Sequence, residues 1–444
     1  MPTLLWFRRD LRCHDHPALL EAAQSGGEVL ACYVLDPRLE ASSGARRLQY
    51  LYEALRELSE NLDGNLLVTR GRPQERIPAL AGAIGATSVH ISQDCSPFGR
   101  RRDDTVRAAL GETDLCATGS AYLVSPGRIT KSDGTPYQVF TPFFRAWHRQ
   151  GWRAPADSGP GSARWIAPVQ IPAGIGDQIE IPSTTMDLTF GVGESAARLQ
   201  WREFVEQGLA GYPARRDRPD LDATSRMSAH LKFGTIHPRT MAVDLDSGND
   251  AYLRELAFRD FYAAVLYHWP DSAWQNWNHD FDAIEVDDDK AARRAFEAWK
   301  AGRTGFPIVD AGMRQLSATG FLHNRVRMIV ASFLVKDLHL PWQWGAGWFL
   351  EQLIDGDMAN NQHGWQWAAG CGTDAAPYFR VFNPDLQGAK FDPDGAYIRR
   401  WVPELADVAD VHKLGSDRPL SYPEPIADHA EERLEALRRY RRLG

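Results

Sequence analysis

The chain has 444 residues, of which 43% are hydrophobic and 24% charged, so it is long enough for two or three domains with sizeable cores. Its formal net charge of −8 argues mildly against a nucleic-acid partner, and any such surface would have to be a local basic patch. No apolar run is long enough to predict a membrane span, and the N-terminus lacks the pattern of a signal peptide.

Cysteine spacing excludes a zinc ribbon and a disulfide scaffold. The five cysteines are odd in number and form no CxxC pair; they are Cys13, Cys32, Cys95, Cys116 and Cys371. This usage predicts reduced thiols in an intracellular, cytoplasmic protein. No cluster of metal ligands and no nucleophile–histidine–acid triad is evident, so we expect no metal site.

Residues 1–130 alternate short apolar runs with helical patterns, which is typical of βαβ units. The expected strands are Leu4–Phe7, Val29–Leu35, Leu66–Thr69 and Ser88–Ser92, and the expected helices are Pro17–Ala23, Arg46–Leu62 and Arg76–Ile84. The sequence therefore predicts a doubly wound parallel-sheet α/β domain, with a ligand at the carboxyl ends of its strands. Gly191–Ala196 imitates a dinucleotide fingerprint but lies outside a βαβ unit, so we discount it.

Residues 131–193 form the expected connector, and residues 151–190 within it are rich in proline with scattered glycine and serine. From residue 194 to 444 the patterns are helical. The expected helices are Glu194–Gln207, Tyr252–Tyr267, Lys290–Trp299, Val309–Thr319, Arg325–Leu338, Trp348–Ile354 and Glu431–Arg442. We expect an all-α second half, and the charges of its last, basic helix to form a solvated face.

The most unusual stretch is Asp355–Trp367, which reads DGDMANNQHGWQW. Its acids and amides can line one side of a turn and the first helical turn after it, where they could hydrogen-bond a planar polar ring. Trp365 and Trp367 follow, and rings of that size carry a large packing energy. A capped helix end with a solvated aspartate pair would explain DGD alone, but not the whole string.

These residues carry a resemblance. Asp355–Trp367 followed by Gly372–Asn383 resembles the flavin-binding signature of the DNA photolyase/cryptochrome family. Further stretches match the family in order: Trp6–Leu19, Thr224–Gly234, Gly305–Leu316 and His323–Met328. The last of these, HNRVRM, is similar to class I photolyases, which repair cyclobutane pyrimidine dimers. The resemblance implies an antenna-chromophore domain over 1–130 and an FAD- and DNA-binding catalytic domain over 194–444.

The resemblance also implies the residues that bind FAD. The phosphate side would use Tyr212, Thr224, Ser225, Arg226, Met227 and Ser228, where a helix start favours anions. Arg327 and Asp355 would form an ion pair beside the flavin ring, Asp357 would face its polar edge and Asn361 would lie near N5. An amide at N5 suits a reduced, anionic flavin, because a carboxylate there would repel its charge. Arg259 could pair with phosphate or with a carboxylate. The further expected FAD contacts are Tyr252, Glu255, Arg259 and Asn324.

The lesion site is expected against the flavin. Tyr252, Glu255 and Arg259 share one helical face, and Glu255 resembles the glutamate that hydrogen-bonds the dimer, although a salt bridge with Arg259 would also explain it. Asn324 and Met328 are spaced i, i+4, and Trp367 resembles the aromatic that wedges a flipped dimer. The candidate phosphate contacts, each of which would also suit a solvated surface, are Arg216, Arg325, Arg380, Lys390 and Arg399.

Several positions depart from the family pattern. Phe258 stands where many dimer photolyases have tryptophan, and Phe321 and Tyr252 also replace tryptophans. The tryptophan wire that reduces the flavin under light matches at Trp365 and Trp342. Its outer member aligns near Asp289, so Trp344 or Trp348 would have to substitute. The altered wire bears on photoreduction more than on repair, whereas Phe258 implies weaker stacking on the dimer.

The N-terminal domain would hold an antenna chromophore. Arg47, Arg100, Asp103 and Lys232 resemble the type that binds a deazaflavin (8-HDF) rather than methenyltetrahydrofolate. The other interpretation is that Arg100–Arg102 form a solvated helix start.

The resulting prediction is light-driven repair of cyclobutane pyrimidine dimers in UV-damaged DNA, by electron transfer from excited reduced FAD. The alternative is a blue-light photoreceptor, a cryptochrome without repair activity. Repair of (6-4) photoproducts ranks third, because His323-Asn324 lacks a paired histidine. A nucleotide-binding protein without light chemistry would be colourless when purified. We expect a monomer with no obligate protein partner and no membrane association.

Overall fold

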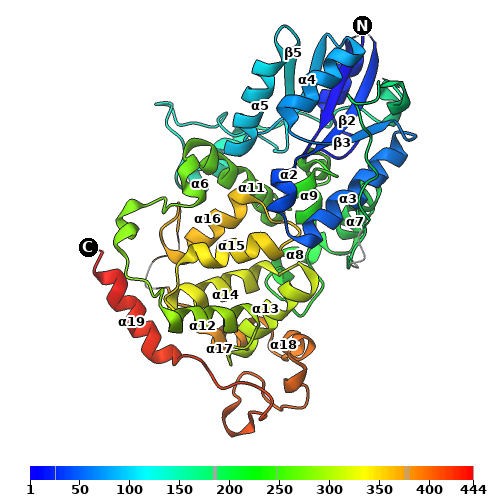
Figure 1. The fold of residues 1–444 in the computed structure, drawn as a ribbon. Coiled ribbons are helices and arrows are strands. Elements are labelled where there is room, and N and C mark those ends of the chain that lie inside the picture. The colour runs from blue at the N-terminus through cyan, green and yellow to red at the C-terminus, as the bar shows by residue number, and fades with distance from the viewer. Residues whose placement is uncertain (26, 184–187, 247, 376, 378–379, 444) are drawn as a thin grey trace. The chain divides into compact units, whose positions relative to one another are not determined.

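The computed structural model of the protein describes residues 1–443 except 26, 184–187, 247, 376, 378 and 379 (Figure 1). The contacts divide the chain into two compact units, unit 1 with Met1–Ala210 and Ser225–His268, and unit 2 with Gly211–Thr224 and Trp269–Gly444. This division differs from the predicted border at residue 194, because residues 194–210 and 225–268 group with the sheet. The predicted fold class, a doubly wound parallel sheet followed by an all-α region, is confirmed.

Unit 1 contains a parallel sheet with the strand order β3-β2-β1-β4-β5. Its strands are β1 (Thr3–Phe7), β2 (Glu28–Leu35), β3 (Leu66–Arg70), β4 (Ser88–Gln93) and β5 (Asp114–Ser120). The first four match the predicted strands. The order runs outward in both directions from β1, so the carboxyl ends of β1 and β4 flank the switch point where ligands of such sheets bind.

Unit 1 also contains helices, of which some pack on this sheet. They are α1 (Pro17–Gln24), α2 (Pro37–Ala41), α3 (Ala45–Asn61), α4 (Pro73–Ile84), α5 (Pro97–Leu110), α6 (Phe140–Gln150), α7 (Glu194–Gln207), α9 (Ser228–Phe233), α10 (Pro238–Ala242) and α11 (Asp250–His268). Helix α1 contacts β1, β4 and β5, whereas Ile77 of α4 and Val106 of α5 join the apolar cluster of Leu4 and Trp6. Helix α7 begins and ends where the sequence predicts.

The expected connector contains ordered structure. Helix α6 lies within it, and the short strand β6 (Arg164–Trp165) pairs in parallel with β2. Residues 184–187 of this segment lie outside the described residues.

The regular elements that the structure describes in unit 2 are all helices, joined by turns and irregular segments. Its helices are α8 (Tyr212–Arg215), α12 (Lys290–Lys300), α13 (Pro307–Thr319), α14 (Asn324–Lys336), α15 (Trp342–Gln352), α16 (Met358–Ala369), α17 (Pro384–Phe391), α18 (Ala396–Trp401) and α19 (His429–Arg441). The predicted helix over Trp348–Ile354 is part of α15. Helix α15 ends at Gln352, two residues before the predicted end, so Asp355 lies in the turn before α16.

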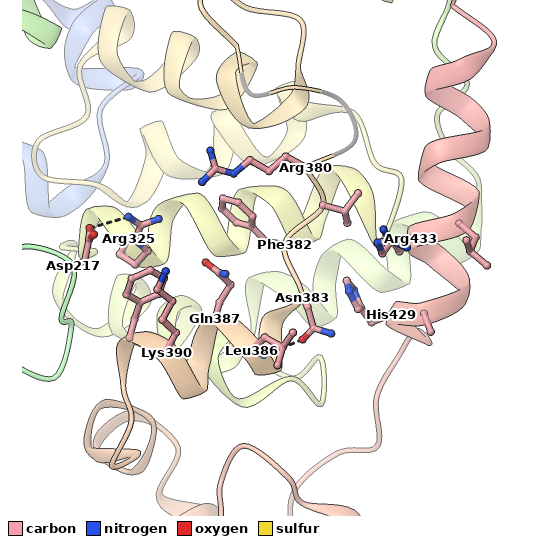
Figure 2. Close-up of a pocket in the computed structure, with 14 residues that line it drawn as sticks. Asp217, Arg325, Arg380, Phe382, Asn383, Leu386, Gln387, Lys390, His429 and Arg433 are labelled. Atoms are coloured by element: carbon pink, nitrogen blue, oxygen red, sulfur yellow. Dashed lines mark hydrogen bonds and ion pairs between the residues drawn. The ribbon is translucent and has the colours of Figure 1, made fainter.

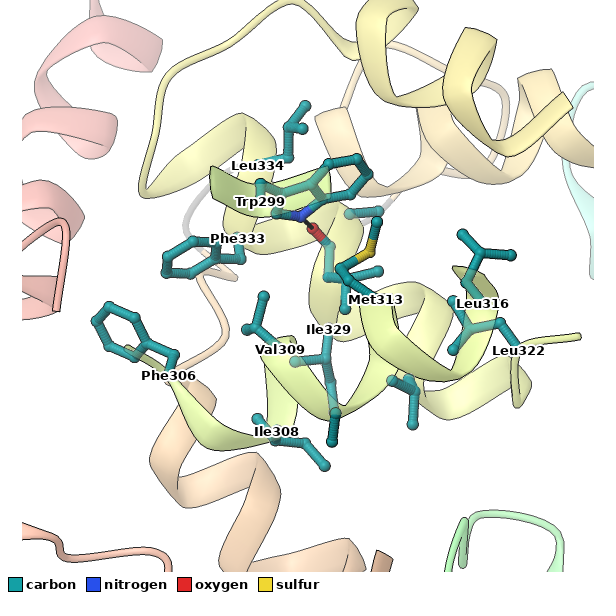
Figure 3. Close-up of a cluster of buried hydrophobic side chains, with 14 of the residues drawn as sticks. Trp299, Phe306, Ile308, Val309, Met313, Leu316, Leu322, Ile329, Phe333 and Leu334 are labelled. Atoms are coloured by element: carbon teal, nitrogen blue, oxygen red, sulfur yellow. Dashed lines mark hydrogen bonds between the residues drawn. The ribbon is translucent and has the colours of Figure 1, made fainter. Parts of the chain in front are cut away.

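The core of unit 2 is built by α12, α13 and α14 around Trp299 (Figure 3). The indole Nε1 of Trp299 donates to the carbonyl of Val330 at 3.1 Å, so this buried ring has no unmet polar group. Asp310, buried at the start of α13, accepts hydrogen bonds from Thr304, the Gly305 amide and the Tyr422 hydroxyl. The family-like stretch Gly305–Leu316 therefore has a structural role. Among the described residues, no helix is long and apolar enough to cross a bilayer.

Candidate functional site

The turn between α15 and α16 presents an ion pair. Arg327 Nη2 lies 2.8 Å from Asp355 Oδ2, and Arg327 Nε donates to the carbonyl of Leu322 at 2.8 Å. The Asp355 side chain is only 8% exposed, and its second oxygen, Oδ1, is buried with no hydrogen-bond partner among the described residues. The ion pair predicted from the sequence is present. A buried carboxylate oxygen without a donor is costly unless a ligand supplies one.

Helix α16 begins at the second aspartate of this stretch. Asp357 is its N-cap and accepts from the Asn360 amide at 3.1 Å. One turn later, Asn361 Nδ2 donates to the carbonyl of Ala346 at 3.0 Å and to Gln362 Oε1 at 2.7 Å. Both donor bonds of the Asn361 amide therefore hold it in one orientation.

Helix α14 carries the predicted lesion residues of unit 2. Asn324 opens the helix and is exposed, and Met328 is half-buried one turn later. At 100° per residue, Asn324, Arg327 and Met328 lie on one side of α14, whereas Arg325 points to another side. Arg325 lies 2.9 Å from Asp217.

A groove of about 820 Å³ lies on that other side of α14, in unit 2 (Figure 2). Three of the predicted DNA-binding residues, Arg325, Arg380 and Lys390, line it together. Each cation lies over an aromatic ring: Arg325 at 4.3 Å and Lys390 at 5.1 Å from the centroid of Phe391, and Arg380 at 5.4 Å from that of Phe382. Such contacts hold the cations in place. Arg380 and Lys390 have no ion pair among the described residues, whereas Arg325 also pairs with Asp217 at 2.9 Å.

The sequence did not predict the other residues of this groove. Arg433 and His429 of α19 line it at the end opposite Arg325 in Figure 2, and Asn383 and Gln387 also line the groove. The only signal for Arg433 was the basic C-terminal helix, which the sequence assigned to a solvated face. Residues 376, 378 and 379 of the matched stretch Gly372–Asn383 lie outside the described residues.

The remaining predicted DNA-binding residues lie elsewhere in unit 2. Arg216 lies 5.8 Å from the centroid of Tyr212, and Trp367 is half-buried against the core of unit 2. The Arg399 guanidinium donates to the carbonyls of Val408 and Ala409, which assigns it to loop structure and not to phosphate binding.

Aromatic rings form a row through unit 2. Buried Trp365 lies 6.0 Å from Trp299, which stacks 5.8 Å from Phe296, and Phe296 lies 5.3 Å from half-buried Trp344. Trp342 is buried, and its indole Nε1 donates to Asn276 Oδ1 at 2.8 Å. Asp289, at the position of the missing outer tryptophan, is the N-cap of α12.

Four of the residues expected on the phosphate side of FAD lie in unit 1, just before α9 or at its start. Ser225 Oγ lies 2.7 Å from the Tyr252 hydroxyl, and its carbonyl accepts from Gln200 at 2.7 Å. Arg226 has a φ of 54°, which a residue with a Cβ adopts at a cost. Met227 is buried before the helix, whereas Ser228 is exposed. Thr224 and Tyr212 belong to unit 2. Thr224 is half-buried there, and Tyr212 is buried.

Two of the predicted site residues on α11, Phe258 and Arg259, contact other parts of unit 1. Phe258 stacks on Phe140 of α6, with centroids 3.4 Å apart, so one face of its ring is covered by protein. The guanidinium of Arg259 donates to the carbonyls of Ala121 at 2.6 Å and Leu231 at 3.0 Å. Arg259 therefore ties α11 to α9, and its expected pairing with phosphate stays a prediction.

The predicted antenna residues lie on three helices of unit 1. Asp103 of α5 is buried between Arg8 and Arg102, at 2.8 Å from each. Arg100 lies over Tyr267, Arg47 is buried in α3, and Lys232 is half-buried in α9. The cavity at the switch point, lined by Arg8, Asp94 and Tyr122, has a volume of about 10 Å³. That volume holds one water molecule at most.

Comparison with known families identifies the fold. A family described as DNA photolyase matches residues 3–160, and the FAD binding domain of DNA photolyase matches residues 252–442. The chain belongs to the DNA photolyase family. Proteins named deoxyribodipyrimidine photo-lyase are 40% identical in Halobacterium salinarum, where 99% of this chain and 98% of the relative align, and 40% identical in Thermus thermophilus, where 100% and 98% align.

Solved structures of this photolyase family agree over the whole chain. A class III photolyase from Agrobacterium tumefaciens superimposes with a TM-score of 0.90 at 34% identity, covering 100% of this chain and 97% of that one. A photolyase from Sulfolobus tokodaii with two FAD molecules gives 0.88 at 29% identity, covering 100% of both chains. A cryptochrome from Synechocystis gives 0.88 at 28% identity, covering 99% of both. The expected class I assignment stays a prediction.

The residues of unit 2 fit the FAD that this family binds. The unsatisfied Oδ1 of Asp355 suits a ring N–H donor, the Arg327 guanidinium suits a ring carbonyl, and the fixed amide of Asn361 leaves its oxygen available.

Proposed function

We propose that the protein is a light-driven enzyme that repairs cyclobutane pyrimidine dimers in DNA. The observation that carries this proposal is the match, over nearly the whole chain, to relatives named deoxyribodipyrimidine photo-lyase. Reduced FAD, when bound and excited by light, supplies one electron to the dimer and accepts it again after the cyclobutane ring has opened.

In this proposal Arg327 and Asp355 orient the flavin ring, Asp357 faces its polar edge, and Asn361 lies near N5. The support is the 2.8 Å ion pair, the unmet Asp355 oxygen and the two bonds that fix the Asn361 side chain. Because Asn361 is neutral, it places no negative charge beside a reduced ring. The expected phosphate-side roles in the segment from Thr224 to Ser228 remain part of the proposal.

The groove of unit 2 is proposed to bind the DNA backbone. Arg325, Arg380 and Lys390 supply three cations held on aromatic rings, and Arg433 adds a fourth at the other end. Guanidinium groups suit phosphate, because two parallel N–H donors match two oxygens. Only Asp217 among the described lining residues is acidic, and it pairs with Arg325 at 2.9 Å.

Lesion contacts are assigned to Glu255, Asn324, Met328 and Trp367, with Phe258 as a partial substitute for tryptophan. The stack of Phe258 on Phe140 leaves at most one ring face for a base. We therefore place more of the stacking energy on Trp367, the half-buried ring that follows Trp365 in α16.

For the antenna we retain the deazaflavin type over methenyltetrahydrofolate, with Arg47, Arg100 and Lys232 as contacts. Asp103 is a weaker candidate, since its carboxylate already forms ion pairs with Arg8 and Arg102. The pigment extracted from protein purified under native conditions tests this assignment by its absorption spectrum.

A blue-light photoreceptor is the second candidate, supported by the altered tryptophan wire and by Phe258. The deciding experiment uses chemically reduced protein and an oligonucleotide with one thymine dimer, and it measures intact thymine after blue light and after darkness. Recovery in the light alone supports repair. If yellow, flavin-bound protein recovers no thymine, the photoreceptor becomes the better assignment.

A further inference from the structure

Helix α6 has two faces of different chemistry. Phe140, Phe143 and Trp147 are buried in unit 1, and the Trp147 indole donates to Asp260 Oδ2 of α11 at 2.9 Å. The opposite face carries Arg145, His148 and Arg149 at i, i+3 and i+4, and Arg153 follows directly after the helix. All four side chains are exposed. We refer to these four residues as the α6 surface.

The α6 surface is strongly basic although the whole chain has a net charge of −8. No aspartate or glutamate occurs from residue 134 to 156. None of the three arginines has an ion pair or a side-chain hydrogen bond among the described residues. The arginines of α19 differ, because Arg438 and Arg439 pair with Glu435 on their own helix. The α6 cations therefore form no structural ion pair among the described residues.

Aromatic rings are interleaved with these cations. His148 lies 6.1 Å from Phe144 and 6.4 Å from Trp152, and Arg254 of α11 lies over the rings of Phe140 and Phe144 at 5.0 and 4.9 Å. Phe140 in turn stacks on Phe258, so α6 packs on the helix that carries the proposed lesion residue Glu255. Alternating basic and aromatic side chains are typical of nucleic-acid surfaces.

We propose that the α6 surface binds the phosphate backbone of duplex DNA, as a contact of unit 1 in addition to the groove of unit 2. The inference rests on the proposed function, which makes DNA the substrate. Unpaired, exposed guanidinium groups gain affinity for phosphates by releasing counterions from the DNA, independently of base sequence. The surface therefore holds damaged and undamaged DNA equally, while the lesion residues discriminate between them.

The test compares two double variants with the same loss of charge. Arg145→Ser/Arg149→Ser removes two cations of the α6 surface. Arg198→Ser/Arg202→Ser removes two exposed arginines, also spaced i, i+4, from α7 of the same unit. Binding to a fluorescein-labelled duplex, with or without one thymine dimer, is followed by anisotropy between about 50 and 200 mM salt.

We expect the α6 variant to bind both duplexes roughly tenfold more weakly at the low salt, and the slope of log K against log salt to fall by about 2. The ratio of the two affinities stays at the parent value. The α7 variant binds like the parent. Thermal midpoints equal to that of the parent exclude loss of fold, since all four substituted side chains are exposed.

Three results would overturn the inference: parent-like binding by the α6 variant, an equal loss in both variants, or a loss confined to the dimer-containing duplex. A loss of binding to phosphatidylserine vesicles without a loss for DNA would assign the surface to a membrane instead. If the parent neither binds the duplex nor repairs it in light, the proposed function fails. If the parent does both and the α6 variant binds equally well, only the α6 inference fails.

Discussion

Arg327 and Asp355 form an ion pair in which only one of the two carboxylate oxygens of Asp355 contacts the guanidinium. Oδ2 lies 2.8 Å from Arg327 Nη2, while Oδ1 is buried without a partner among the described residues. A buried acceptor of this kind costs about 1–3 kcal/mol of stability when it is left unmet. The pair is therefore better explained by a bound ligand that donates a hydrogen bond than by folding alone.

Asp355→Asn should weaken FAD binding. The substitution removes the charge that balances Arg327 and turns an acceptor into a donor at one position, at a cost of about 2 kcal/mol, or roughly thirtyfold in Kd. Flavin released on dilution measures the effect by its fluorescence. Glu351→Gln, an exposed acid at the end of α15, should leave Kd unchanged. Equal losses from both variants would show that Asp355 acts only through net charge.

Asn361→Asp should destabilise the reduced flavin. A carboxylate near N5 opposes the charge of the anionic ring by about 2–3 kcal/mol at an effective dielectric constant near 20. The variant should reoxidise faster in air, as followed by the return of visible absorption. Asn361→Ala, which loses the two donor bonds without adding charge, separates the two causes. If both variants reoxidise at the same rate, added charge is not the cause.

Two glycines of α15 should respond to alanine with opposite signs. A Cβ on Gly345 would overlap the buried ring of Trp365, whereas nothing lies near a Cβ on Gly347. Gly345→Ala should therefore lower the unfolding free energy by about 1–3 kcal/mol, and Gly347→Ala should raise it by about 0.5–1 kcal/mol. Denaturant midpoints measure both. A stabilising Gly345→Ala would mean that the helix and Trp365 repack freely.

Asp260 should make stability depend on pH between about 4 and 6. Burial raises the pKa of Asp260 to about 6, although Val124 N and Trp147 Nε1 both donate to its Oδ2. Unfolded, the same carboxyl titrates near 4. In that window the folded state retains a proton that the unfolded state releases, so stability falls as the pH rises, by up to about 3 kcal/mol.

Asp260→Asn provides the control, because it keeps an acceptor oxygen and does not titrate. The thermal midpoint of the parent relative to this variant should decline from pH 4 to pH 6 and then level off. A difference that is constant across this range would show that the pKa of Asp260 is the same in the folded and unfolded states.

Light-driven reduction of the flavin should depend on the aromatic row of unit 2. Trp365, Trp299, Phe296 and Trp344 follow one another with centroids 5.3–6.0 Å apart. Trp344→Phe should slow photoreduction more than Trp342→Phe, as measured by the loss of oxidised-flavin absorption under blue light with an external donor. The reverse order would assign the electron to Trp342, the position that matches the family wire.

The periodicity of apolar residues was enough to predict many of the strands and helices. The strands from β1 to β4 and helix α7 follow from apolar patterns that local burial dictates. The edge strand β5 was missed because Asp114–Ser120 is half exposed and carries few apolar side chains. Helix α6 was missed because we assigned residues 131–193, which end in a proline-rich stretch, to a connector.

The sequence by itself determined the family and the fold class, because both depend on local sequence patterns. The Arg327–Asp355 pair joins positions 28 residues apart, and it could be expected only through the family resemblance. Only the tertiary structure decided that Phe258 stacks on Phe140, that Arg8 and Arg102 occupy Asp103, and that Arg433 joins Arg325 in one groove. The physical reason is that these contacts join positions far apart in the chain. No spacing encodes such contacts, because packing alone selects which buried partners meet.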